Sequence, residues 1–462
     1  MGNEINELNG VGFANIAKVN GVASANITHV NGMDLVQTID IATITSYAAV
    51  EESGSAITDA QYGVNMSYDE DNDFVYVQYA LSGGGGGAVV GAYNSSSNDV
   101  DFGAEQTIES SNAFSGNSCD YDKYNNRIWT AWIGGGDNTL YARCGRINSD
   151  KTITWGSRLT VQGGVNTSSN YNQGLIQQGL AVDQSTGKCL IVWNSAADNI
   201  SGQSNHHPTG VILTIDDPSA SDTDSDFCDI SAGSQVRMQA GGSGQDFPII
   251  LCHYDPDNTE WVAVTDADGS STGIIGLRIT DNSGNPAAAN ATSLPSNSGH
   301  VLQGSKSVNG GRYGGLTFIY DESSDHFMVG SSTSSATPKI FAMQNSGSGI
   351  SWDTTGIAVS HGHEASQSGR GGTMAYSHAR GRFMSHGNNN SSETLEIFSY
   401  DGTDFTSHND SSLITINSDN DGFFRGGASM QNMSAFAGGA VMIVGTDYDS
   451  RDPYYIIIEA GG

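Results

Sequence analysis

Short apolar segments separated by polar turns repeat along most of the chain. In each repeat, an apolar segment ends in an aromatic or aliphatic residue that Asp usually follows, and a second apolar segment begins after a short polar stretch. Tyr68–Asp69 before Phe74–Val77 and Tyr121–Asp122 before Arg127–Trp132 show this pattern. Apolar runs bounded by Gly, Asn, Asp and Ser indicate strands joined by tight turns. The corresponding reference positions are Tyr68, Tyr121, Val182, Tyr254, Tyr320, Tyr376 and, in a degenerate copy, Met433.

These repeats are regular enough to predict a fold. Their reference positions lie 53, 61, 72, 66, 56 and 57 residues apart. Each repeat continues with a third apolar segment and a fourth that carries Ile-x-Trp or an equivalent, as at Ile153–Trp155 and Ile350–Trp352. Four short strands in each of seven repeats predict an all-β protein, a seven-bladed β-propeller, whose closed ring leaves no long sheet edge exposed.

The seventh repeat shows only three of its four strands, and the beginning of the chain offers the missing one. Residues 39–51 precede the first repeat and have the same pattern as the fourth strands elsewhere. We therefore expect Thr43 to Val50 to pair beside Tyr455 to Ile458 and to close the ring. The propeller domain would then occupy residues 34–462.

Residues 1–33 carry a different repeat, with a period of 11 residues. Each copy contains Ile, an aliphatic residue three positions later, and then Asn-Gly, which readily takes the positive φ of a tight turn. A unit this short cannot bury its own apolar side, so we expect a β-rich docking segment that also joins several chains. A flexible tail is the alternative. The expected docking residues are Ile5, Ile16, Ile27, Val19 and Val30.

Composition narrows the class of protein. The 462 residues include 60 Gly, 18 Lys and Arg, and 50 Asp and Glu, which gives a net charge of −32. Aromatic and β-branched residues are too frequent for a disordered chain, and the glycines follow no collagen period. The charge opposes binding to nucleic acid or anionic lipid. No apolar run is long enough for a membrane span, and the N-terminus lacks the features of a signal peptide, so we expect neither membrane insertion nor export through one.

Several short motifs resemble those of known families. Asn148–Trp155 and Asn345–Trp352 resemble the Asp-box turn of sialidases, which is structural in that family. The Tyr-Asp repeat resembles propeller repeats in virion proteins of tailed bacteriophages, particularly marine ones, and Asn15–Val22 resembles N-terminal repeats of phage tail and fibre proteins.

The resemblance to phage proteins implies a structural component of the virion, assembled in the cytoplasm of the bacterial host. The N-terminal segment would dock on other virion proteins as part of a homo-oligomer. The propeller would face outward, as a tail fibre or receptor-binding component that attaches to a host surface glycan without cleaving it. A glycan hydrolase on the same fold, and a head-decoration or adaptor protein without a receptor, are the alternatives.

Residues just before three inner strands form the candidate ligand site. In a chain poor in arginine, three guanidinium groups at related positions of consecutive repeats can bind a carboxylate or phosphate of a glycan. The alternative is that each arginine pairs with a neighbouring acidic turn. The candidate residues are Arg312, Tyr313, Arg370, Phe424 and Arg425.

Turns dense in carboxylates are the candidate metal sites. Alternating oxygen ligands in a loop suit Ca²⁺, although none of these turns has EF-hand spacing, and solvated turns are the alternative. We expect no other cofactor. No catalytic residue emerges, because no nucleophile elbow, phosphate loop or zinc motif is present and nothing singles out a catalytic carboxylate pair. The candidate calcium ligands are Asp69, Asp71, Asp73, Asp222, Asp224 and Asp226.

Overall fold

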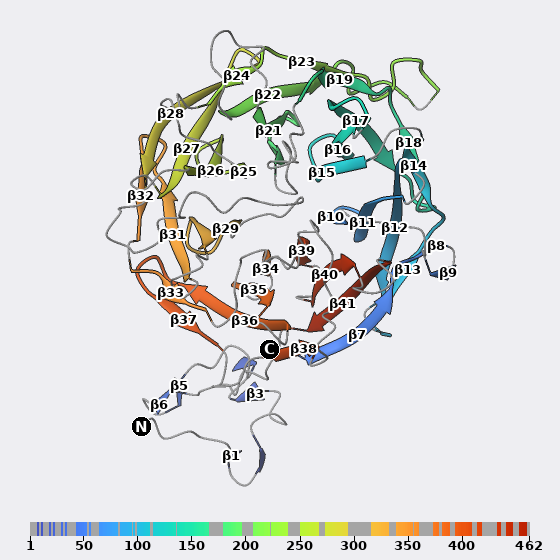
Figure 1. The fold of residues 1–462 in the computed structure, drawn as a ribbon. Coiled ribbons are helices and arrows are strands. Elements are labelled where there is room, and N and C mark those ends of the chain that lie inside the picture. Colours follow the sequence, from blue (N-terminus) through green and yellow to red (C-terminus); the bar gives the residue numbers. More distant parts are fainter. Residues whose placement is uncertain are drawn as a thin grey trace.

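The computed structural model is an all-β ring of seven sheets, which confirms the predicted propeller (Figure 1). The described part of the chain contains no helix long and apolar enough to cross a lipid bilayer. The structure describes residues 7–8, 11–12, 18–19, 22–23, 29–30, 33–34, 43–52, 55–56, 64–81, 84–94, 96–97, 99–110, 114–134, 136–165, 179–195, 207–221, 223–238, 250–267, 273–293, 316–331, 339–353, 355–359, 373–377, 381–388, 393–408, 414–417, 432–435, 440–446 and 452–459.

Each sheet, or blade, is a series of antiparallel strands that runs outward from the centre of the ring. Blade 1 contains β10 (Asn65–Asp69), β11 (Phe74–Ala80), β12 (Gly86–Asn94), β13 (Asp99–Phe102) and β14 (Gln106–Glu109). Blade 2 contains β15 (Phe114–Asp122), β16 (Arg127–Gly134), β17 (Thr139–Ile147), β18 (Ile153–Trp155) and β19 (Leu159–Gln162). Blade 3 contains β20 (Leu180–Val182), β21 (Cys189–Ser195), β22 (His207–Ile215), β23 (Ile230–Ala232) and β24 (Val236–Arg237).

The remaining blades follow the same order around the ring. Blade 4 contains β25 (Ile250–Asp255), β26 (Glu260–Ala267), β27 (Gly273–Asn282) and β28 (Asn285–Ser293). Blade 5 contains β29 (Leu316–Asp321), β30 (His326–Ser331), β31 (Lys339–Asn345), β32 (Ile350–Trp352) and β33 (Ile357–Ala358). Blade 6 contains β34 (Thr373–Ser377), β35 (Arg382–Asn388), β36 (Glu393–Tyr400), β37 (Phe405–Ser407) and β38 (Ile414–Asn417). Blade 7 contains β39 (Asn432–Ala435), β40 (Ala440–Thr446), β41 (Pro453–Glu459) and β7 (Thr43–Ala49).

The expected closure of the ring is confirmed in blade 7. Strand β7 pairs antiparallel with β41, with Ala48 opposite Tyr455 and Ile44 opposite Ile458. A strand from before the first repeat thus supplies the outer strand of the last blade. The two ends of the propeller sequence are held together by backbone hydrogen bonds, which closes the ring.

The outer strand of most blades is interrupted, a feature that the sequence pattern did not predict. In blade 1, for example, β13 pairs with the end of β12 while β14 pairs with its beginning, so that two short strands share one partner. Blades 2, 3, 5 and 6 have the same arrangement. The predicted fourth segments at Ile153–Trp155 and Ile350–Trp352 are the first of these two short strands.

The core lies between blades rather than inside any one of them. Both faces of the sheets are apolar, and the buried side chains of the described residues form a hydrophobic cluster at each of the seven boundaries between blades. Trp129 of blade 2 and Trp193 of blade 3 share one cluster, and Phe318 of blade 5 packs with Val264 of blade 4 in another. The inner strands also contact one another around the whole ring, from β10 through β39 and back to β10.

The N-terminal repeat forms short hairpins with the predicted period. β1 (Glu7–Leu8) pairs with β2 (Val11–Gly12), β3 (Lys18–Val19) with β4 (Val22–Ala23), and β5 (His29–Val30) with β6 (Met33–Asp34). Asn-Gly separates the two strands each time, as expected for two-residue hairpin loops. A further hairpin, β8 (Glu51–Glu52) with β9 (Ser55–Ala56), follows β7.

Candidate functional site

The two faces of the ring differ in how the strands are connected. Because neighbouring strands are antiparallel, the links from first to second and from third to fourth strand lie at one face, which we call the turn face. The links from second to third strand and from one blade to the next begin and end at the opposite face, which we call the loop face. The first-to-second links of the turn face span only residues 70–73, 123–126, 183–188, 256–259 and 322–325 in blades 1 to 5.

Several links between blades at the loop face are much longer, although the link from blade 1 to blade 2 spans only residues 110–113. The long links separate β19 from β20, β28 from β29 and β38 from β39 by residues 163–179, 294–315 and 418–431. Ligand-binding residues lie disproportionately on long connections that a rigid scaffold holds, so this face is the candidate site by topology. All five predicted ligand-binding residues, Arg312, Tyr313, Arg370, Phe424 and Arg425, fall in such links, outside the residues that the structure describes.

The turn face is built by the Asp residues of the repeated motif. At the end of β10, Asp69 is buried, and its Oδ1 accepts hydrogen bonds from the backbone N–H groups of Asp71 and Asn72, each at 3.1 Å. Asp255 does the same at the end of β25, accepting from the N–H groups of Asp257 and Asn258. Such a carboxylate replaces the water that the turn N–H groups would otherwise need. Asp122, Asp183 and Asp321 cap the equivalent turns.

Tyr residues of the motif form hydrogen bonds with the first-to-second turn of the preceding blade. The Tyr121 hydroxyl of blade 2 donates to Asp71 Oδ2 of blade 1 at 2.9 Å, and the Tyr320 hydroxyl of blade 5 donates to Asp257 Oδ2 of blade 4 at 2.7 Å. Burial and the nearby carboxylates raise the pKa of both tyrosines, so both hydroxyls stay protonated and can donate. In blade 6, the Tyr376 hydroxyl instead accepts from the Ser323 N–H.

Blade 3 makes the same connection with a different side chain. Its motif has Val182 in place of tyrosine and cannot donate. Gln184 takes over: its Nε2 donates to the Tyr121 carbonyl at 2.7 Å, and its Oε1 accepts from the Lys123 N–H at 2.9 Å. The link between neighbouring turns is therefore kept where the motif is degenerate.

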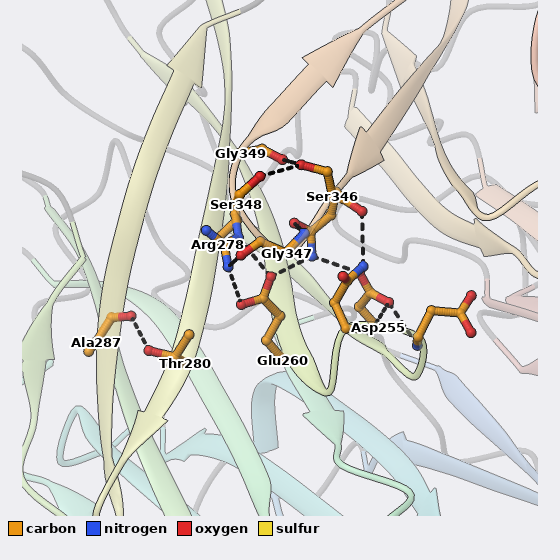
Figure 2. A network of polar contacts seen from close by, with 12 residues as sticks. Asp255, Glu260, Arg278, Thr280, Ala287, Ser346, Gly347, Ser348 and Gly349 are labelled. Carbon is orange, nitrogen blue, oxygen red and sulfur yellow. Dashed lines mark hydrogen bonds and ion pairs between the residues drawn. The ribbon is translucent and has the colours of Figure 1, made fainter.

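A buried ion pair supports the turn face between blades 4 and 5 (Figure 2). Arg278 donates through Nε to Glu260 Oε1 at 2.7 Å and through a terminal nitrogen to Oε2 at 2.8 Å, a bidentate geometry. Asn345, the first residue of an Asp-box-like turn, donates to both Glu260 Oε1 and Asp255 Oδ2. Arg278 also reaches the Gly347 carbonyl of that turn. The Asp-box-like turn is thus structural here, as the resemblance implied.

The predicted calcium ligands of blade 1 hold the turn together. Asp69 caps the turn, Asp71 accepts from Tyr121, and Asp73 accepts from the Tyr68 hydroxyl. In the second set, Asp224 and Asp226 are exposed, Asp224 accepts from Ser221, and Asp222 lies outside the described residues. Within the described part of the chain, no group of three or more His, Cys, Asp or Glu residues is arranged to hold a metal ion. Calcium binding at these turns stays a prediction.

The predicted docking residues are described in part. Val19 lies in β3 and Val30 in β5, at equivalent positions of two hairpins. Ile5, Ile16 and Ile27 lie outside the described residues. The docking hypothesis therefore rests on the sequence period and on the repeated hairpins.

A titratable group missed by sequence reasoning is Asp120, next to the Tyr121–Asp122 motif. Its Oδ2 accepts the Val182 N–H of the next inner strand at 2.9 Å, and its Oδ1 accepts the Tyr121 N–H at 2.9 Å. The residue keeps some surface exposure, yet its carboxylate is enclosed by protein, and burial raises its pKa to about 7. Asp122 also raises this pKa, while the two N–H donors lower it. The sequence offered one signal for this group: Asp120 directly precedes the Tyr121–Asp122 pair, in a segment predicted to be an inner strand.

Comparisons with known proteins give distant structural similarity and identify no family. No family model and no curated protein matches the sequence. A protein of unknown function from Dyadobacter fermentans is 11% identical over 91% of this chain and 100% of that chain, with a TM-score of 0.46. Trypanosoma rangeli sialidase is 8% identical over 86% of this chain and 58% of that chain, with a TM-score of 0.43. AofleA from Arthrobotrys oligospora is 8% identical over 80% of this chain and 96% of that chain, with a TM-score of 0.38.

Substitution of Tyr320 tests the link between turns. Tyr320→Phe removes the hydroxyl that donates to Asp257 at 2.7 Å and to Asp325 at 3.0 Å, so we expect a loss of about 1–2 kcal/mol in the free energy of unfolding. Chemical denaturation measures it. Tyr124→Phe is the matched control, because Tyr124 is 62% exposed. Equal losses in the two variants would contradict the structural role of the hydroxyl.

Asp120 predicts a pH dependence of stability. Its folded-state pKa of about 7 lies above the ordinary value of 3.8, so its contribution to stability is complete below pH 3.8 and is lost as the pH rises through 7. The stability difference between Asp120→Asn and the unsubstituted protein should therefore shift in favour of the variant by roughly 2–4 kcal/mol between pH 4 and pH 8. Urea titrations across this range measure it. Asp404→Asn, at an exposed site, serves as control; a flat difference for Asp120→Asn would refute the assignment.

Proposed function

We propose that this protein is a non-enzymatic structural component of a bacteriophage virion that binds a host surface glycan at the loop face. The observation that carries the proposal is the contrast between the two faces. The first-to-second links of the turn face are short turns whose polar groups bond to one another, whereas the loop face receives the blade-to-blade links of residues 163–179, 294–315 and 418–431. The link of residues 216–229 in blade 3 is a long connection at the turn face. A rigid ring that presents long connections on one face suits recognition.

Charge supports the same choice of face. Exposed carboxylates recur around the turn face, at Glu70, Asp150, Asp257 and Asp401 among others, and repel an anionic glycan. Lysines of this face are engaged: Lys123 pairs with Glu70, and Lys151 with Asp101. Arg312, Arg370 and Arg425 belong in sequence to links of the loop face, and a cationic patch that they form there would bind a carboxylate or phosphate.

The virion assignment rests on the sequence resemblance and on the form of the N-terminal segment. Three hairpins of identical length recur every 11 residues ahead of the propeller. Repeated units of this kind gain stability by stacking on one another or on partners. We infer that this segment docks on other virion proteins, as part of a homo-oligomer, and holds the propeller outward.

Removal of the three arginines tests glycan binding. Adsorption of the full chain to a panel of neutral and acidic bacterial polysaccharides should fall at least tenfold in the triple variant R312A/R370A/R425A, because three charge-assisted contacts are lost. The triple variant K123A/K151A/K188A removes the same charge from the turn face and should adsorb as the unsubstituted protein does. Unchanged adsorption in the arginine variant would reject the patch, and release of oligosaccharides during incubation would favour a hydrolase.

Antibody labelling of whole particles tests the virion assignment. If the protein docks through residues 1–33, label should mark intact phage particles, and the labelled position distinguishes tail from head. Particles assembled with a chain that lacks residues 1–33 should carry no label. Label retained on those particles would contradict docking through the hairpins, and the absence of label from all particles would contradict a virion role.

A further inference from the structure

Two buried thiols meet across the boundary between blades 2 and 3. Cys144 lies in β17, the third strand of blade 2, and Cys228 lies in the turn between β22 and β23 of blade 3. Both belong to the hydrophobic cluster of this boundary, and Gly156, which bonds to the Cys144 carbonyl, lies against Cys228. The other three cysteines, Cys119, Cys189 and Cys252, are also free and buried.

The local backbone is shaped to bring the two residues together. Cys228 has a φ of 55°, in the left-handed region that side chains other than Asn and Asp rarely adopt. Gly156 directly follows β18 and lies between Cys144 and Cys228. Its N–H donates to the Cys144 carbonyl at 2.9 Å. A Cβ at Gly156 would strike the Cys228 carbonyl and lie 2.7 Å from the Cys228 Cβ. The glycine therefore lets the Cys228 turn pack directly on the strand of Cys144.

The surroundings favour a thiolate over a bound cation. The guanidinium groups of Arg127 and Arg146 lie 5.2 and 5.6 Å from the centre of the Phe227 ring, next to Cys228 in sequence. The neighbouring Cys144 thiol lowers the pKa of Cys228, and the positive charges of Arg127 and Arg146 lower it further against the effect of burial. Two fixed cations oppose a metal ion at this place, whereas they stabilise the anionic nucleophile.

We propose that Cys144 and Cys228 form an oxidation site that reacts with a small hydroperoxide and closes a disulfide between blades 2 and 3. The Cys228 thiolate attacks one peroxide oxygen, the O–O bond breaks, and the leaving hydroxide takes a proton to become water. The resulting sulfenic acid is attacked by the Cys144 sulfur, the S–S bond forms, and the sulfenic oxygen leaves as a second water. Two thiols and one hydrogen peroxide thus give one disulfide and two waters.

The position of the two cysteines determines how a peroxide reaches them and what a disulfide between them does to stability. Cys228 is buried, but residues 223–226 of the same turn are exposed, so a local opening of this turn admits a molecule as small as hydrogen peroxide. The disulfide would add a covalent link between two blades that are otherwise held by side-chain packing and hydrogen bonds. It would also close a long loop of chain, which restricts the unfolded state strongly.

Peptide mapping after peroxide treatment tests the proposal. The full chain, treated with hydrogen peroxide and digested without reduction, should yield a peptide pair that links Cys144 to Cys228 and lacks two hydrogens. The oxidised protein should unfold at a higher temperature, by roughly 5 °C or more, and reduction should reverse the shift. Five free thiols after treatment, or a link that involves Cys119, Cys189 or Cys252, would overturn the proposal.

Substitutions separate the two thiols. Cys144→Ser should leave a sulfenic acid at Cys228, which dimedone traps, while Cys228→Ser should leave Cys144 unmodified. Arg146→Gln should slow the reaction several-fold without preventing it. Cys252→Ser is the matched control, and should form the disulfide at the original rate. Equal trapping at Cys228 and Cys252 in the Cys144→Ser variant would contradict selective activation, and mapping of the unsubstituted protein decides the question if a variant fails to fold.

Discussion

The structure depends on one constraint: each sheet is apolar on both faces and must bury both against its neighbours. Strand β16 shows it, since all eight of its residues are buried. In the described part of the chain, no ladder of backbone hydrogen bonds joins one blade to the next. Side-chain clusters at the seven boundaries therefore supply the stabilisation, and an open arc would leave two apolar faces in water. Pairing of β7 with β41 fixes the point where the arc closes.

Packing of this kind is not directional, so polar contacts are needed to fix how the blades are aligned. The hydroxyls of Tyr121 and Tyr320 and the amide of Gln184 do this at the turn face, because each bonds to one particular turn of the neighbouring blade. The cost of this arrangement is that the carboxylates of the turn face are occupied by structural bonds. This use of the turn-face carboxylates agrees with our proposal that recognition takes place at the opposite, loop face.

The periodic pattern of the sequence predicted the strands and the blades, but it did not predict contacts between residues that are distant in sequence. The repeated Tyr-Asp pairs predicted the blade number, the apolar segments predicted the strands, and the pattern of residues 39–51 predicted the closure by β7. The density of carboxylates in the first turn led to a metal-ligand hypothesis for Asp69, Asp71 and Asp73, which stays a prediction. The sequence did not indicate that two of these residues accept hydrogen bonds from tyrosines. The contact of Asn345 with Glu260 joins residues 85 positions apart, and the register between blades that creates it leaves no local pattern. The proximity of Cys144 and Cys228, which also depends on the register between blades, likewise leaves no local pattern in the sequence.

The degenerate copies of the motif show that its Tyr and Asp positions vary from blade to blade. Val182 lacks the hydroxyl, yet Gln184 restores the link; Ser377 replaces the capping Asp in blade 6, and Met433 replaces the tyrosine in blade 7. A hydrogen bond of this kind contributes about 1 kcal/mol, whereas burial of a large apolar side chain contributes about 2–3 kcal/mol. Because each boundary contains many buried apolar groups, the loss of one polar link does not open the ring. Selection can therefore vary the motif blade by blade, while the apolar faces of all seven sheets must be kept.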